Sequence, residues 1–453
     1  MTQDAMTSGE KRASIGLALV FSFRMLGLFM ILPIFSHYGQ SLAGSTPLLI
    51  GLAIGAYGFS QAVLQVPFGF ISDRIGRKPV ILFGLLMFAI GSVVAALSDS
   101  IYGVLVGRFL QGGGAIASTV MALLSDLTRE QHRTKAMAMV GMSIGLSFSI
   151  ALVAGPLLGG WLGLSGIFWL TAFLACIGIV IVVWGVPTPT TQVAYREAVV
   201  SSGAFTEVLR HGQLWRLNVG VFVLHLTMTA MFIVMPAMLL LHTELAVDEH
   251  WQVYLPILLV SFVVMVPFII VGEKKRKLKP IFCSAVLLLA LASLFLSRVA
   301  ESAWWILIWL FFYFLSFNLL EATLPSLVSK WAPPAAKGAA MGVYSSSQFL
   351  GAAVGGGVGG WLLGAYGGAS VFIVCGTLAV LWFLYAVTMK TPPYVTSLMV
   401  PLSQVEHDTA SQLLDELLAL RGVEDAVVIP EEKAAYLKVD NKRFDKSLLA
   451  RFS

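Results

Sequence analysis

Residues 69–79 read GFISDRIGRKP, a charged turn between two long apolar runs at about 47–72 and 79–98. Each run is long enough to cross a bilayer, which takes about 20 apolar residues. The turn is therefore a very short loop at a membrane surface. Asp73 and Arg77 stand four residues apart, which is the spacing of neighbours on one helical face. This pattern indicates that the loop has a specific function and does not merely connect two spans.

The composition is that of an integral membrane protein. Of the 453 residues, 58% are hydrophobic and 12% are charged, whereas soluble domains carry about 25% charged residues. Only the chain after about residue 393 reads as water-soluble. No large catalytic domain fits in the remainder, so we expect neither an enzyme nor a nucleic-acid partner. Twelve spans of the required length are predicted near 14–38, 47–72, 79–98, 101–125, 137–161, 164–187, 213–241, 250–272, 280–298, 303–329, 336–362 and 369–390.

Positive charge is distributed unevenly over the predicted loops. Lys and Arg lie in the N-terminal segment, in the even-numbered loops and after the last span, whereas the odd-numbered loops contain only Arg298. Cytoplasmic loops carry the excess of positive charge in membrane proteins. We therefore expect both termini to be cytoplasmic.

The two predicted halves repeat at a fixed offset. VPF at 66–68 recurs at 266–268, and GGWL at 159–162 recurs at 359–362. An offset of six helices keeps both copies in one orientation, as parallel repeats, and two bundles that rock about a mid-membrane site can give alternating access. The predicted division is an N-terminal six-helix bundle at 1–187, a partly helical cytoplasmic linker at 188–212, a C-terminal six-helix bundle at 213–392 and a soluble cytoplasmic domain at 393–453.

Further motifs accompany the charged turn in order along the chain. RFLQGGGA occupies residues 108–115, GPLLGG occupies 155–160, and Leu26-Gly27 precedes Pro33. With the turn, these motifs resemble the Major Facilitator Superfamily, specifically its twelve-span drug:proton antiporter branch, although Ala151 stands where the helix-5 motif usually has glycine. The resemblance implies an all-α membrane fold of two six-helix parallel repeats. It also implies efflux across a bacterial inner membrane, driven by the proton gradient with no cofactor.

The resemblance gives the charged turn a conformational role. It implies that Asp73 faces the N-terminus of helix 11 near Gly338, whose dipole attracts an anion, and that Gly69 lets the two backbones approach. Arg77 would also reach Asp126 at the inner end of helix 4, closing the cytoplasmic side in the outward-facing state. The alternative is that the charges only set the topology. The expected latch comprises Gly69, Asp73, Arg74, Gly76, Arg77, Lys78, Asp126 and Gly338.

Four ionisable residues inside the predicted spans are the candidates for proton coupling in a central cavity. Arg108 lies about 10 Å from the outer end of helix 4 and Arg24 near the middle of helix 1, where a charge should face the interior or a water-filled cavity. The resemblance assigns Arg108 to proton transfer, with a structural arginine as the alternative, and Arg24 would bind or balance an anion. Glu321 is the coupling acid or part of a structural ion pair. His225 is the other candidate for the protonatable group, because an unperturbed histidine titrates near neutral pH; the alternative is a neutral hydrogen-bonded histidine.

A second group of small residues is predicted to pack helices together. Pro156 should break or bend helix 5, because proline removes a backbone hydrogen bond. Gly155, Gly159 and Gly160 permit close helix contact, as does the run at 355–360. We expect these glycines at the seam between the halves and not at the ligand.

The tail has the element order of a small α+β domain. Strands are predicted at 394–402, 424–429 and 434–439, with helices at 408–420 and 443–451. This βαββα order resembles ferredoxin-like heavy-metal-binding domains but lacks their paired cysteines, and the three cysteines of the chain all lie in predicted spans. We therefore predict no metal site, and a regulatory or assembly role for the tail.

The main hypothesis is a monomeric proton-coupled antiporter that exports small amphipathic molecules. Its partners would be the small-molecule substrate, protons and the lipid bilayer. One alternative is a facilitator or symporter of a small solute, which the helix-5 motif disfavours. The other is a transporter-like membrane sensor that signals through its C-terminal domain.

Overall fold

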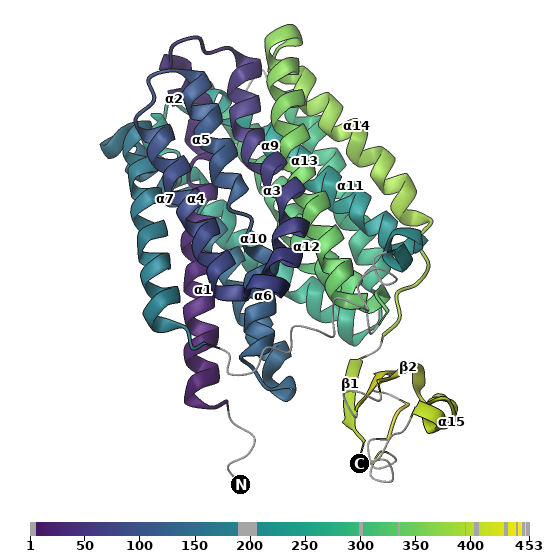
Figure 1. Ribbon diagram of the computed structural model, residues 1–453. Helices are drawn as coiled ribbons and strands as arrows, with labels where there is room; N and C mark the ends of the chain where they lie inside the picture. The colour runs from purple at the N-terminus through teal and green to yellow at the C-terminus, as the bar shows by residue number, and fades with distance from the viewer. Residues whose placement is uncertain are drawn as a thin grey trace.

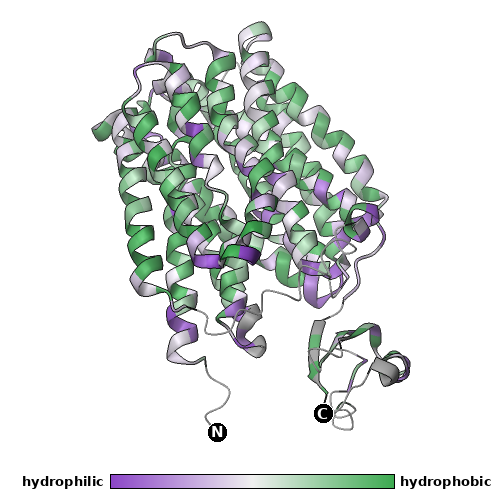
Figure 2. Cartoon of the chain, in the orientation of Figure 1, coloured by the Kyte–Doolittle hydropathy of each residue, from purple (hydrophilic) through white to green (hydrophobic). Residues whose placement is uncertain are grey.

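The computed structural model describes residues 6–188, 206–298, 302–333, 336–394, 396–402, 407–429, 434–440, 443–445 and 449. It is a bundle of long helices with a small domain at one end (Figure 1). The start of α1 (Ser8–Phe29) lies at that same end, which we call the terminal end; the opposite one is the distal end. Apolar residues dominate the helices between the two ends (Figure 2), as expected where lipid surrounds a bundle.

The helices alternate in direction and follow the predicted spans closely. After α1 come α2 (Leu32–Tyr38), α3 (Pro47–Ile75), α4 (Arg77–Ala96), α5 (Ile101–Gly113), α6 (Ala117–Asp126) and α7 (Glu130–Val180), which continues as a π-helical turn at Ile181–Gly185. The second half contains α9 (Gly212–Thr243), α10 (Trp251–Lys274), α11 (Leu278–Leu296), α12 (Ala303–Trp331), α13 (Lys337–Tyr366) and α14 (Gly368–Val387).

Local sequence explains where several helices begin and end. The side chain of Thr46 accepts a hydrogen bond from the Leu49 amide, and Pro47 occupies the first turn of α3; both are favoured at a helix N-terminus. Gly76 separates α3 from α4 with a φ of 100°, and Gly367 separates α13 from α14 with a φ of 83°. Glycine adopts positive φ without the steric cost that other residues incur.

The twelve predicted spans are confirmed. Eleven helical segments among the described residues are long and apolar enough to cross a membrane, and one of them, Lys135–Gly185, has 51 residues. At 1.5 Å per residue it would be about 76 Å long, more than twice the thickness of the hydrocarbon core. Gly163, with φ 65° and ψ −178°, interrupts it. It therefore makes two spans.

The structure bears on two predictions for this region, the effect of Pro156 on helix 5 and the linker after it. The helix runs through Pro156 without a non-helical residue, and the interruption comes at Gly163; of the predicted break or bend at the proline, the break is wrong and the bend stays a prediction. A proline can stay inside a helix when neighbouring helices support the freed carbonyl. Of the predicted linker at 188–212, residues 189–205 lie outside the described residues, and residues 206–210 are helical.

The two halves meet backbone to backbone at the distal end. A Cβ added to Gly51, Gly55 or Gly58 of α3 would overlap a backbone carbonyl of α13, and one added to Gly356 would overlap the Gly51 carbonyl. Small residues allow such an approach between membrane helices. By contrast, a Cβ added to Gly338, at the terminal end of α13, has no atom within 4 Å. The α3–α13 contact is therefore tight at the distal end.

The small domain is a three-stranded antiparallel sheet with one described helix. Its elements are β1 (Thr396–Pro401), α15 (His407–Leu418), β2 (Val423–Ile429) and β3 (Ala434–Val439), and the sheet order is β1-β3-β2. Leu417, Leu437 and Val439 are buried in its core. The ferredoxin-like prediction is confirmed for these elements. The predicted last helix at 443–451 falls largely outside the described residues.

We predict that replacing Gly356 by alanine (G356A) opens the distal end, because the new methyl group would overlap the Gly51 carbonyl. Overpacking costs about 1–3 kcal/mol, which corresponds to at least a five-fold shift between conformations. The reporter is S36C in a background with all three cysteines replaced by alanine. Ser36 is buried and donates to the Phe232 carbonyl, across the two halves (3.3 Å).

Faster thiol labelling of the reporter is expected in G356A. The matched control is G364A on the same helix, where an added Cβ meets Pro47 at an ordinary 3.5 Å. Equal labelling rates in the two variants would contradict the proposed role of the glycine contact.

Candidate functional site

A histidine and a glutamate from different helices meet inside the second half. His225 of α9 has its Nε2 atom 3.7 Å from Glu321 Oε2 of α12. The side-chain nitrogen of Gln348, on α13, lies 2.8 Å from His225 Nε2 and 3.4 Å from Glu321 Oε1. His225 Nδ1 lies 3.1 Å from the Val221 carbonyl. A neutral histidine with its proton on Nδ1 satisfies these contacts, because Nε2 then accepts from the amide.

The glutamate keeps a free acceptor position. Glu321 Oε2 has no hydrogen-bond partner among the described residues. The Glu321 side chain is 33% exposed, whereas His225 is 6% exposed. The pair can therefore hold one proton between His225 Nε2 and Glu321 Oε2; this oxygen is itself buried, although the glutamate side chain as a whole is partly exposed.

Aromatic rings connect this pair to the first half. Phe317 of α12 lies 5.9 Å from the His225 ring and 5.6 Å from Phe148 of α7, measured between ring centroids. Phe148 in turn meets Phe29 of α1 edge to face at 5.0 Å. This row of rings crosses from one half to the other and gives an apolar lining to the region beside the titratable pair.

Two arginines are buried in the first half. Arg24 of α1 and Arg108 of α5 are each 1% exposed. Arg24 donates to Gln61 Oε1 of α3, and Arg108 donates to Gln111 Oε1 at 2.8 Å. The guanidinium carbons lie 5.7 Å and 5.1 Å from the centroid of the Tyr57 ring. Both arginines point into the protein, as predicted for charges inside spans.

The four ionisable residues form two groups instead of one. No hydrogen bond or ion pair in the described part of the chain joins the arginines to His225 and Glu321. Sequence reasoning also missed the residues that hold the groups in place, although polar side chains inside apolar spans were a usable signal. These residues are Tyr57, Gln61, Gln65, Gln111 and Gln348.

The charged turn forms part of the expected latch. Arg77 makes an ion pair with Asp73, one helical turn away, and its Nε lies 3.4 Å from Asp126 Oδ2 of α6. Arg77 also donates to the hydroxyl of Ser72 at 2.8 Å. These contacts join the α3–α4 turn to the end of the fourth span. Gly76 makes the turn possible through its positive φ.

The other expected latch contacts are not made in this structure. Within the described residues, no hydrogen bond or ion pair joins Asp73 to α13, and the nearest neighbour of an added Cβ at Gly69 is Ser118 of α6 at 3.5 Å. The close approach expected at Gly69 for the outward-facing state is not made here; in this structure the close approach of α3 to α13 is at the distal end. Lys78 donates to the Val186 carbonyl at 2.5 Å, and Arg74 is exposed.

The helix-5 glycines pack mainly within their own half. A Cβ at Gly155 would overlap the carbonyl of Met30, which follows α1, and one at Gly159 would approach Ile34 of α2. Gly160 instead approaches Asp248, in the second half. The predicted place at the seam is therefore right for Gly160 and wrong for Gly155 and Gly159.

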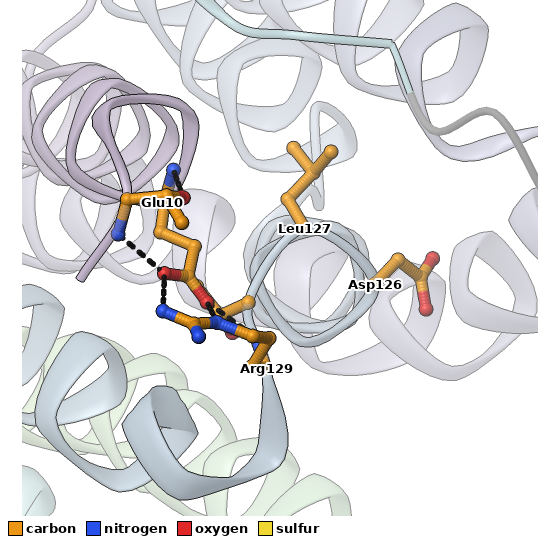
Figure 3. Close-up of a pocket in the computed structure, with 6 residues that line it drawn as sticks. Glu10, Asp126, Leu127 and Arg129 are labelled. Carbon is orange, nitrogen blue, oxygen red and sulfur yellow. Dashed lines mark hydrogen bonds and ion pairs between the residues drawn. The ribbon is translucent and has the colours of Figure 1, made fainter. Parts of the chain in front are cut away.

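A surface pocket lies beside the latch at the terminal end (Figure 3). It has a volume of about 380 Å³. Arg129 bridges to the buried Glu10 carboxylate through Nε and Nη2, both at 2.9 Å. The paired Glu10 carboxylate thus fastens the start of α1 to the chain that follows Asp126. Its lining residues are Thr7, Glu10, Asp126, Leu127, Thr128 and Arg129.

The small domain docks on the second half through charged groups. Lys438 of β3 donates to the carbonyls of Ala332 at 2.5 Å and Lys330 at 3.2 Å, at the end of α12. Asp440 makes an ion pair with Arg276, in the α10–α11 turn. Burial lowers the pKa of the Lys438 ammonium. The last carbonyls of a helix have no partner within the helix, and a cation there is favoured by the helix dipole.

Comparison with known proteins shows where the chain belongs. The Major Facilitator Superfamily matches residues 17–330 and, in a second match, 279–404; the YajR YAM domain matches residues 401–447. The inner membrane transport protein YajR of Escherichia coli K12 is 48% identical over 443 residues, which cover 98% of this chain and 97% of that protein. The solved structure of the human organic anion transporter MFSD10 is 19% identical with a TM-score of 0.61, covering 84% of this chain and 100% of that one. The xylose transporter XylE from E. coli is 16% identical with a TM-score of 0.63, covering 85% and 96%.

We predict that K438M frees the last turn of α12. Hydrogen bonds to charged groups contribute about 1.5–3 kcal/mol, so amide exchange over residues 328–333 should accelerate about 10- to 100-fold, measured by hydrogen–deuterium exchange. The control is K277M, which removes an exposed cation from the α10–α11 turn. Unchanged protection in K438M would show that the domain does not stabilise this helix end.

Proposed function

Because the chain belongs to the Major Facilitator Superfamily and is a multi-pass inner-membrane transporter, we propose that it is a proton-coupled antiporter. It exports small amphipathic molecules by alternating access. Protons enter from the distal side and substrate from the terminal side, with both termini cytoplasmic. The proposal treats 1–187 and 213–392 as the two rocking bundles of a monomer, 188–212 as their linker and 393–453 as an attached soluble domain.

The observation that carries the proposal is the Glu321–His225 pair. Ionisable residues inside membrane spans are costly and usually functional, and a proton carrier must be reachable by water at some stage of the cycle. The Glu321 side chain is partly exposed, and its buried Oε2 has no hydrogen-bond partner in the part of the chain that the structure describes. The adjacent His225 and Gln348 would orient the carboxylate for proton exchange, and substrate would arrive beside the aromatic row.

The proposal assigns this structure to the state closed at the distal end. The glycine contact between α3 and α13 closes that side. The Asp73–Arg77–Asp126 group is then half of the latch. Its other half, the N-terminus of α13 near Gly338, would join when the bundles rock and the terminal end closes.

We predict that E321Q abolishes proton-driven transport and preserves downhill exchange, because the amide cannot release a proton. Substrate movement into proteoliposomes would be measured with and without an imposed pH gradient. The control E273Q alters an acid at the end of α10 that pairs with Lys330 (3.1 Å). Gradient-driven accumulation at the normal rate in E321Q would remove Glu321 from the coupling mechanism.

We predict that D73N shifts the population toward the distal-closed state. In the state closed at the terminal end, the variant loses the attraction between Asp73 and the α13 N-terminus, which is worth about 0.3–1 kcal/mol. The ion pair between Arg77 and Asp126 is present in both states and does not change. Labelling of the S36C reporter should slow about two- to five-fold. R74Q, an exposed charge in the same turn, is the control. A D73N reporter that labels as fast as the parent would argue against the latch.

The alternatives differ in what crosses the membrane. A facilitator would equilibrate solute without responding to the pH gradient, and a symporter would move solute in the same direction as protons. A sensor would move none. A screen on everted vesicles would first identify a transported compound. The proteoliposome assay with that compound then separates these three outcomes from antiport.

A further inference from the structure

The arginine group in the first half has positive charge without an acid to match it. Arg24 and Arg108 are almost completely buried, and both guanidinium groups lie within 6 Å of the Tyr57 ring centroid. No ion pair among the described residues includes either arginine. Buried charges are normally paired, because desolvation is costly.

The donors of these arginines are only partly satisfied. Arg24 Nε and Nη1, and Arg108 Nε and Nη2, have no hydrogen-bond partner in the part of the chain that the structure describes. A guanidinium carries five N–H donors. Each arginine thus donates to the amide oxygen of one glutamine and has further donors without a partner among the described residues.

The two amides are themselves held in orientation. Gln61 donates from Nε2 to Gln65 Oε1 at 3.2 Å, which directs Gln61 Oε1 at Arg24. Gln111 donates from Nε2 to the Ser92 hydroxyl at 2.7 Å, which directs Gln111 Oε1 at Arg108. The neutral amide oxygens that accept from the arginines are therefore held in place by the hydrogen bonds that Gln61 and Gln111 donate. This arrangement positions the arginines without neutralising them.

The carboxylates near the membrane interior are occupied elsewhere. Glu321 is engaged by His225 and Gln348 in the other half. Asp73 and Asp126 share Arg77 at the terminal end. None of these carboxylates therefore pairs with Arg24 or Arg108 in this structure.

We propose that Arg24 and Arg108 bind the carboxylate of the transported molecule, so that the substrates are amphipathic monocarboxylates. This inference rests on the proposed function. A guanidinium donates two parallel hydrogen bonds to a carboxylate. Rings next to the arginines suit the apolar body: Phe88 lies 5.8 Å from the Arg24 guanidinium, and Phe349 of α13 lies 6.3 Å from Tyr57. The first half thus holds the anion and the second half holds the proton.

The test is direct binding to the purified full chain in lipid nanodiscs, without a gradient. Octanoate is compared with octanamide and octylammonium, which keep the chain length and change only the head group, at constant sodium chloride. Thermal unfolding followed by tryptophan fluorescence reports binding. Octanoate should raise the midpoint and saturate, while the neutral and cationic analogues should not. Equal responses to all three would overturn the proposal, because they would show binding of the alkyl chain only.

Substitution of either arginine locates the site. R24Q and R108Q should each weaken octanoate binding about 10- to 100-fold, as expected for loss of a charged hydrogen-bond partner, and R24K should fall between, since lysine keeps the charge without the fork. R298Q, at an exposed position, should bind normally. Without octanoate, R24Q and R108Q should be at least as thermostable as the parent, because each removes an uncompensated buried charge. Lower ligand-free stability with unchanged octanoate affinity would make the arginines structural.

A separate arm raises sodium chloride alone. If chloride stabilises the parent as octanoate does, and through the same arginines, the site holds an inorganic anion and the substrate assignment fails. Binding without proton-driven movement in proteoliposomes would contradict the antiporter proposal but not the carboxylate site. Proton-driven movement of a lipophilic cation, with no response to octanoate, would contradict the carboxylate site alone.

Discussion

The backbone contact between α3 and α13 is the constraint on which the arrangement of the two halves depends. Gly51, Gly55 and Gly58 meet the carbonyls of α13 with no room for a side chain. Since packed interfaces have discrete arrangements, this contact is either made or broken. It fixes how α1 and α5 of one half lie relative to α9 and α12 of the other.

The polar groups of the membrane interior share one feature. Each charge is held by glutamine or by another ionisable residue, and none is held by backbone alone: Arg24 by Gln61, Arg108 by Gln111, and Glu321 by Gln348 and His225. Amides can donate to a carboxylate or accept from a guanidinium. They tolerate a change of charge at their neighbours better than a fixed ion pair does. This suits sites whose charge state changes during a cycle.

Much of the fold could be predicted from the sequence, because spans follow from apolar length alone. The prediction failed where tertiary contacts decide. Pro156 stays inside a continuous helix, and the interruption falls at Gly163. Gly356 and Gly360 of the predicted run do meet α3, but Gly51, Gly55 and Gly58 on the facing helix were not predicted, and Gly155 packs against Met30, which follows α1. A local sequence pattern does not show these contacts. The contact between α3 and α13 joins residues about 300 apart along the chain, and the contact between Gly155 and Met30 joins residues 125 apart.

Only part of the candidate site could be predicted, because tertiary contacts also decide which of its residues meet. A lone charge in an apolar run is conspicuous, so Arg24, Arg108, His225 and Glu321 were all identified. Their grouping was not, because it depends on helix rotation. Gln348 was passed over since glutamine is common in many settings, and only the fold shows that it reaches both His225 and Glu321.

The docking of the small domain has a mechanical consequence. Lys438 holds the end of α12, and Asp440 holds the α10–α11 turn, so both anchors belong to the same half of the protein. A body fastened to one side of a hinge travels with that side and adds no resistance to the swing. If the two bundles rock as proposed, the domain would therefore move with the second bundle, and a dye attached to it would report that bundle's motion from the aqueous phase.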